Sequence, residues 1–82
     1  MTAKLANESA LGTYCATWVS SDGARMGVEW GEGMTCPIAF RGGVVRDIAR
    51  PERYGWQKPK KFADFKRFAQ AFADDFEAGN DE

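Results

Sequence analysis

Apolar and polar residues alternate from Thr13 to Trp30, in a stretch rich in residues that favour β-strands. Asp22-Gly23 interrupts the alternation, and this pair is typical of a two-residue hairpin turn. In the hairpin that these two turn residues predict, Val19 lies opposite Met26. One face of the hairpin is then largely apolar and consists of every second residue: Cys15, Thr17, Val19, Met26, Val28 and Trp30.

Two further strands are predicted after this hairpin. Residues 31–33 form a glycine-rich turn, and residues 34–40 form the third strand, with Ile38 and Phe40 in phase with the apolar face. Pro37 cannot donate to a sheet ladder, so it indicates a bulge or an unpaired edge at that point. After a turn over residues 41–43, residues 44–49 form a fourth strand whose register stays open because Val44-Val45 allows two faces.

A helix is predicted after a connection over residues 50–57. Phenylalanine and alanine recur at three- and four-residue spacing from Phe62 to Phe76, and five of the six phenylalanines lie in this stretch. Pro59 suits the first helical position and Gly79 the end of the helix. The stripe is expected to pack on the apolar face of the sheet, and a dimer interface at its edge, near Phe68 or Phe76, is the alternative.

The predicted fold class is therefore α+β: a four-stranded antiparallel β-meander followed by one C-terminal amphipathic helix packed on one sheet face (ββββα). Residues 12–79 form a single domain, and residues 80–82 an acidic C-terminal tail. Residues 1–11 have no clear period and are expected to form a flexible N-terminal tail or a short extra strand. A chain of 82 residues buries one modest core and leaves little room for a deep enzyme cleft.

Several classes of chemistry find no support in the composition. The chain has no histidine, so it lacks the commonest general base and the commonest zinc ligand, and we expect no enzyme, cofactor or metal site. Cys15 and Cys36 are expected to be reduced, buried core residues, because they lie on non-adjacent strands of the predicted meander. No apolar stretch is long enough for a membrane span or a signal peptide, which predicts a cytoplasmic protein.

The charge of the chain is segregated along its sequence, although the net charge is only −1. Residues 41–67 carry nine basic and three acidic side chains, a local charge of +6, and the last fifteen residues carry only acids. Lysines therefore open the predicted helix and acids close it, against the preference of the helix macrodipole. This order favours Arg53, Lys58, Lys60 and Lys61 as a surface for an anion or an acidic partner. Solvated lysines without a partner are the alternative.

Aromatic residues mark two more candidate surfaces. Tyr54 and Trp56 adjoin the basic run, as in platforms for single-stranded nucleic acid, or else they close the edge of the core. Tyr14 and Trp18 fall on the sheet face away from the helix in the predicted register, which suggests a protein interface. A Trp18 ring that covers Gly27 is the alternative on that face.

The leading hypothesis is a small non-catalytic protein-binding module that blocks a macromolecular partner. In size and character the chain resembles the inhibitors that phages and mobile elements encode, including anti-CRISPR proteins. The alternative is a single-stranded nucleic-acid-binding protein, because the ββββα order is similar in topology to the transcriptional-coactivator fold. The expected partner is an acidic or nucleic-acid-binding protein surface, with nucleic acid possible, no membrane, and a monomeric or homodimeric state.

Overall fold

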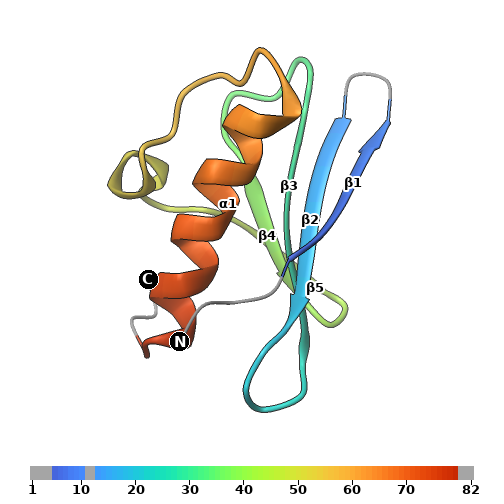
Figure 1. Ribbon diagram of the computed structural model, residues 1–82, viewed down its shortest axis with the longest axis vertical. Helices are drawn as coiled ribbons and strands as arrows, with labels where there is room; N and C mark the ends of the chain where they lie inside the picture. The colour runs from blue at the N-terminus through green and yellow to red at the C-terminus, as the bar shows by residue number, and fades with distance from the viewer. Residues whose placement is uncertain (1–4, 11–12, 80–82) are drawn as a thin grey trace.

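The computed structural model describes residues 5–10 and 13–79. An antiparallel sheet with its five strands in sequence order packs one face against a single long helix (Figure 1). In chain order the elements are β1 (Ala6–Ala10), β2 (Thr13–Val19), β3 (Arg25–Gly31), β4 (Ile38–Arg41), β5 (Val44–Asp47), the 3₁₀ helix η1 (Pro51–Tyr54) and α1 (Phe62–Glu77). The predicted α+β meander with one C-terminal helix is confirmed.

The sheet extends by one strand beyond the predicted four. Ala6–Ala10, within the expected N-terminal tail, forms β1 and pairs antiparallel with β2, so this part of the tail is the short extra strand. Of the other tail residues, the structure describes Leu5, while residues 1–4 and 11 lie outside the described residues. The predicted acidic tail, residues 80–82, also lies outside them.

The loop that closes the β2–β3 hairpin consists of the three residues 21–23, between the hydrogen-bonded Ser20 and Ala24, and not of the predicted two. Ser20 N–H donates to the Ala24 carbonyl at 2.9 Å, and Gly23 N–H donates to the Ser20 carbonyl at 2.9 Å. Gly23 has φ +88°, the left-handed conformation that ends a three-residue hairpin loop. Trp18 therefore pairs with Met26, the partner predicted for Val19.

This shift of one residue turns every side chain of β2 to the opposite face of the sheet. Trp18 is buried beneath α1, with its ring 6.3 Å from that of Phe72, and Tyr14 stacks between Trp30 and Phe65. The predicted exposed surface of Tyr14 and Trp18 is therefore wrong. Val19, predicted to face the core, is instead 70% exposed on the outer face, which is the face away from α1.

The phase of β4 is also opposite to the prediction. Ala39 is buried opposite Val28, whereas Ile38 and Phe40 lie half-buried on the outer face. The Phe40 ring covers Gly27 so closely that a Cβ at Gly27 would lie 2.1 Å from Phe40 Cζ. Phe40 thus has the role that we had considered for Trp18. The strand begins directly after the buried Pro37, as expected for a residue that cannot donate to the ladder.

The phenylalanine stripe of α1 forms the core, as predicted. Phe65, Phe68 and Phe72 are at most 2% exposed, and each contributes roughly 1.5–3 kcal/mol through the apolar surface that it buries. Phe68, expected at the edge of the stripe, is covered by the rings of Tyr54 and Trp56. The helix begins at Phe62, three residues after Pro59, and ends before Gly79, which has φ +92°.

The two cysteines are free thiols. Both are half-buried, so the prediction that they are core residues is wrong. Cys15 belongs to the outer face because β2 is turned over relative to the prediction, and Cys36 lies in the loop before β4.

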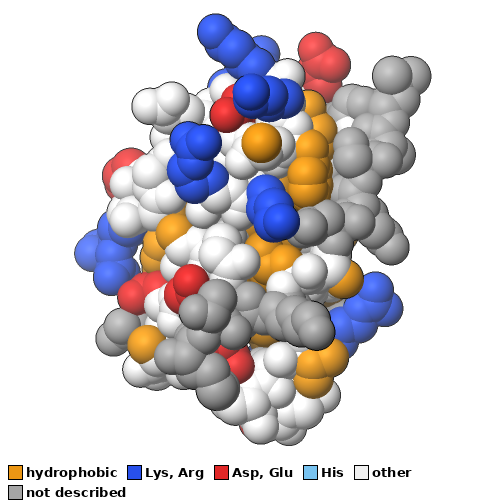
Figure 2. Space-filling model, in the orientation of Figure 1, with side chains coloured by type: hydrophobic (Ala, Val, Ile, Leu, Met, Phe, Trp, Pro, Cys, Tyr) orange, Lys and Arg blue, Asp and Glu red, His pale blue; other side chains and the backbone are white. Residues whose placement is uncertain are grey.

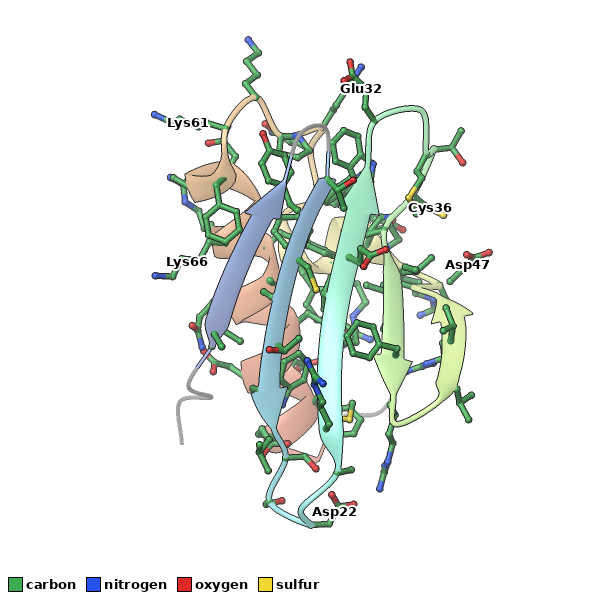
Figure 3. All side chains as sticks on the ribbon, turned by 90° about the vertical axis from the view of Figure 1, so that its right-hand side faces the viewer. Asp22, Glu32, Cys36, Asp47, Lys61 and Lys66 are labelled. Atoms are coloured by element: carbon green, nitrogen blue, oxygen red, sulfur yellow. The ribbon has the colours of Figure 1, made fainter. Side chains whose placement is uncertain are left out.

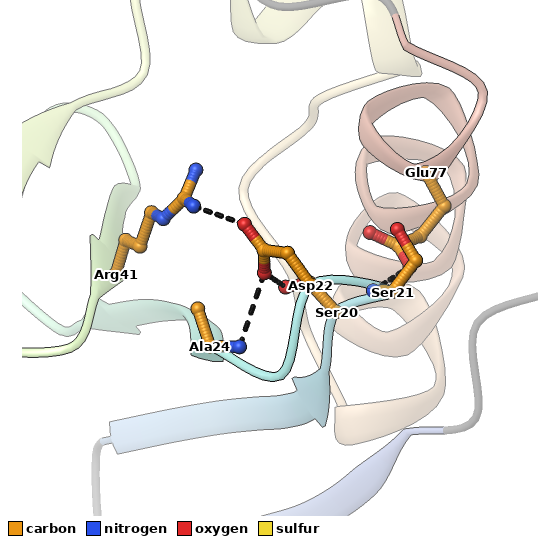
Figure 4. A network of polar contacts seen from close by, with 6 residues as sticks. All are labelled: Ser20, Ser21, Asp22, Ala24, Arg41 and Glu77. Carbon is orange, nitrogen blue, oxygen red and sulfur yellow. Dashed lines mark hydrogen bonds and ion pairs between the residues drawn. The ribbon is translucent and has the colours of Figure 1, made fainter.

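A polar network fixes the loop between β2 and β3 (Figure 4). The Asp22 carboxylate accepts hydrogen bonds from the Ser20 hydroxyl and from Ala24 N–H, and it forms an ion pair with Arg41 of β4. The Ser20 hydrogen bond, then that of Ala24, and the charge of Arg41 hold the pKa of Asp22 below its ordinary value of 3.8. Ser21 N–H donates to Glu77 at 2.9 Å, which ties the loop to the end of α1.

We expect Asp22→Asn to lower the melting temperature at neutral pH and to reduce its fall in acid. Because the folded-state pKa lies below 3.8, the stabilisation is present above pH 3.8 and is lost as the pH falls through the lower folded-state value. Thermal unfolding followed by circular dichroism from neutral to acidic pH measures both effects, with Asp47→Asn in the exposed β5 as the control. Equal melting temperatures for Asp22→Asn and the native protein at neutral pH would contradict a structural role for the network.

Candidate basic binding surface

Cationic side chains gather around the start of α1. Lys58, Lys60 and Lys61 are exposed on the segment before the helix, while Pro59 between them is buried and fixes this segment to the core. Figure 3 shows Lys61 and Lys66 pointing to the same side of the molecule. Figure 2, which views the helix and sheet layers from the side, shows most of the Lys and Arg side chains in view over the upper half, where α1 begins. The basic surface is defined here as Lys58, Lys60, Lys61, Lys66 and Arg67.

Lys58 and Lys60 lie between two depressions of the surface. One, of about 300 Å³, is lined by Tyr54 and Phe68 together with Arg67 and Asp64. The other, of about 170 Å³, is lined by Tyr14, Trp30, Glu32 and Pro59. Each depression thus combines aromatic surface with the same two lysines.

No internal contact accounts for these cations. Within residues 5–10 and 13–79, none of the five side chains of the basic surface forms an ion pair or a hydrogen bond. Asp64, which lines the larger depression, accepts a hydrogen bond from the backbone N–H of Lys60 at 3.2 Å. It lies in the first turn of α1, where the macrodipole favours an acid. The lysines therefore keep their charge available to a partner.

The acids at the other end of the helix, by contrast, have structural partners. Asp74 accepts a hydrogen bond from Gln70 at 2.9 Å, Asp75 accepts one from the Tyr54 hydroxyl at 3.0 Å, and Glu77 accepts that of Ser21 N–H. These contacts join α1 to η1 and to the β2–β3 loop. The acidic end of the helix is thus explained by the fold, and only its basic start calls for another explanation.

Tyr54 and Trp56 close the edge of the core, which was the alternative considered for them. The Tyr54 ring lies 5.2 Å from that of Phe72, and the Trp56 ring lies 4.8 Å from that of Phe68 and 5.9 Å from that of Trp30. Arg53 lies over the Tyr54 ring at 5.6 Å. Both aromatic side chains are half-buried, and only Tyr54 also lines a depression of the basic surface.

The structure therefore brings some of the predicted site residues together and places others in the core or in structural contacts. Lys58, Lys60 and Lys61 come together with one edge of Tyr54, and Tyr14 joins them through the smaller depression. Trp18 is a core residue. The guanidinium of Arg53 lies 3.9 Å from the Asp75 carboxylate, so this side chain belongs to the contact between η1 and α1.

Lys66 and Arg67 complete the basic surface, although they were not among the predicted site residues. The helical period could have indicated them. Positions 66 and 67 lie on the side of α1 opposite the buried phenylalanine stripe, and they are within two turns of Lys60. Counting the charges of that polar face, as well as those of the preceding loop, would have identified them.

Comparisons with protein-family models, with curated proteins and with solved structures give no match to this chain. The similarity in topology to the transcriptional-coactivator fold therefore has no structural match behind it. Among the described residues there is no group of His, Cys, Asp or Glu side chains suited to a metal ion, and no helix has the length and apolar character of a membrane span. The function has to be argued from the geometry of the basic surface.

We expect Tyr54→Phe to lower the free energy of unfolding by about 1.5–3 kcal/mol, the usual contribution of a hydrogen bond to a charged group such as a carboxylate. Urea unfolding of Tyr54→Phe, Asp75→Ala and the double variant gives the coupling between the two side chains. Tyr14→Phe is the matched control, because its hydroxyl has no hydrogen bond within the described part of the chain. A coupling energy of zero would show that the Tyr54–Asp75 contact does not hold η1 against α1.

Proposed function

We propose that the protein is a non-catalytic binding module whose basic surface docks on an acidic surface of a protein partner. The observation that carries this proposal is the set of five exposed cations at the start of α1 that have no internal partner in the described structure. Lys58 and Lys60 border two shallow aromatic-lined depressions, which suit carboxylate side chains flanked by apolar groups. The acids at the other end of α1, by contrast, form hydrogen bonds within the fold.

An acidic protein partner is favoured over nucleic acid because the aromatic rings near the basic surface are packed against other side chains. A base stacks on an open ring face, but the Tyr54 ring carries Arg53 on one side and packs against Phe68 and Phe72. Trp56 is held between Trp30 and Phe68. The sequence pI is near 5.4, whereas domains that bind nucleic acid are usually basic, so a polyanion would be attracted only by the basic surface itself. Single-stranded nucleic acid is therefore the second candidate, supported by the five cations alone.

The mode of action that we propose is occlusion. A small domain with one charged surface inhibits a partner by covering the acidic area that the partner uses for its own contacts, in the manner of the small inhibitors that phages and mobile elements encode. The free thiols of Cys15 and Cys36 suit a reducing compartment such as the cytoplasm, where we place this activity.

We expect Lys58→Glu/Lys60→Glu to weaken partner binding by about tenfold or more and to leave the melting temperature unchanged or slightly raised. The loss follows from charge reversal at the interface, and the neutral or positive effect on stability follows from acids placed ahead of a helix N-terminus. Capture of partners from nuclease-treated host lysate, followed by titration of the captured protein, compares this variant with the native chain. Lys58→Arg/Lys60→Arg is the matched control and should bind as the native protein does.

Two outcomes would contradict the proposal. Native affinity of the charge-reversed variant would show that the basic surface is only solvated. Saturable binding of a labelled single-stranded oligonucleotide at physiological salt, with an affinity that falls steeply as salt is raised, would favour the nucleic-acid alternative.

A further inference from the structure

The outer face of the sheet is apolar at its centre and open to solvent. Figure 3 looks onto this face, and no helix lies in front of the strands. Val19 and Val45 are 70% and 60% exposed there, and Ile38 and Phe40 are half-buried. An exposed apolar sheet face of this kind marks an interaction surface, because water otherwise covers side chains that favour burial.

Two opposite charges flank the centre of this face on the same strand. Arg25 and Glu29 lie two residues on either side of Gly27 in β3, and residues at every second position of a strand share a face. The two side chains start about 13 Å apart, which is too far for an ion pair within one copy. At the midpoint, the Phe40 ring covers Gly27.

This arrangement is complementary to itself. Consider two copies whose outer faces meet, related by a two-fold axis midway between the sheets. The axis runs perpendicular to the strands and passes over Gly27 of β3. The axis reverses the direction of β3 in the second copy, so that Arg25 of each copy lies over Glu29 of the other. The two Phe40 rings then meet at the axis, and Val19 of each copy faces Cys15 of the other.

We propose that the outer face is the interface of a symmetric homodimer in which the β3 strands of two copies cross at Gly27 and form two Arg25–Glu29 ion pairs. A second copy is the occupant that the charge pattern of β3 specifies, since a two-fold axis at Gly27 satisfies both β3 charges and buries the apolar centre at once. Asp47, opposite Ile38 on the edge strand β5, lies at the rim of this interface. An unrelated partner would need the same alternation of charge by coincidence. The product is a four-layer assembly with the two sheets inside and the two helices outside.

The size of the face sets the strength of the dimer. Five strands about 4.8 Å apart, with up to seven residues each, cover about 23 Å by about 19 Å, or on the order of 450 Å² per copy. A stable interface buries about 800 Å² per partner. The dimer is therefore a weak one, with a dissociation constant in the micromolar range or higher, and both basic surfaces remain on its outside.

Sedimentation velocity over a concentration series from micromolar to millimolar tests this proposal. The native protein should shift from monomer to dimer as its concentration rises. Arg25→Glu and Glu29→Arg should each remain monomeric, because every ion pair becomes a repulsion between like charges. Mixing the two single variants should restore a dimer, since each charge of one then faces its opposite on the other. Glu32→Arg, an exposed turn residue outside the face, is the control and should dimerise as the native chain does.

Three results would overturn the proposal. They are a native protein that stays monomeric at millimolar concentration, single variants that dimerise as well as the native chain, and a mixture of the two variants that stays monomeric. Because Arg25 and Glu29 lie outside the basic surface, both single variants should retain the side chains through which an acidic partner is bound. Failure of the dimer is thus distinguishable from failure of the proposed function.

Discussion

The three-residue loop between β2 and β3 is the constraint on which the rest of the structure depends. Gly23 and the Asp22 network close this loop so that Trp18, and not Val19, pairs with Met26. Since the two faces of a strand alternate, this single choice places Trp18 and Tyr14 beneath α1 and leaves Val19 in solvent. The ion pair of Asp22 with Arg41 and the hydrogen bond of Ser21 to Glu77 connect the same loop to β4 and to the helix. One loop thus decides which surfaces of the sheet are available for binding.

The parts of the fold that follow a local period were predictable from the sequence. The phenylalanine spacing predicted the helix and its buried face, and the succession of glycine-rich turns predicted an antiparallel meander. The register was not predictable in this way, because Asp22-Gly23 is typical of a two-residue loop and the contacts that select three residues come from Ser20 and from the distant Arg41. The error in β2 then assigned Tyr14 and Trp18 to the wrong face.

In the candidate site, too, the features set by local sequence were predictable and those set by distant contacts were not. The lysines before α1 are close in sequence, so their proximity in space could be predicted, and the structure adds Lys66 and Arg67 through the helical period. The role of Tyr54 and Trp56 depends on packing against Phe68 and Phe72, far along the chain, and no local pattern distinguishes a ring that closes a core from one that stacks on a ligand. The acids at the end of α1 show the same dependence, since their partners come from η1 and the hairpin loop. Together these contacts leave the basic surface as the part of the charge pattern that folding does not explain.

The register of β2 is therefore the claim to test most directly, and nuclear Overhauser effects between aromatic side chains report on it. The structure predicts cross-peaks between the rings of Trp18 and Phe72, and between those of Tyr14 and Phe65, whose centres lie 6.3 Å and 5.7 Å apart. Cross-peaks from the Trp18 ring to Gly27 and Phe40, with none to Phe72, would place Trp18 on the outer face. That result would contradict the three-residue loop, the composition of the core and the open sheet face together.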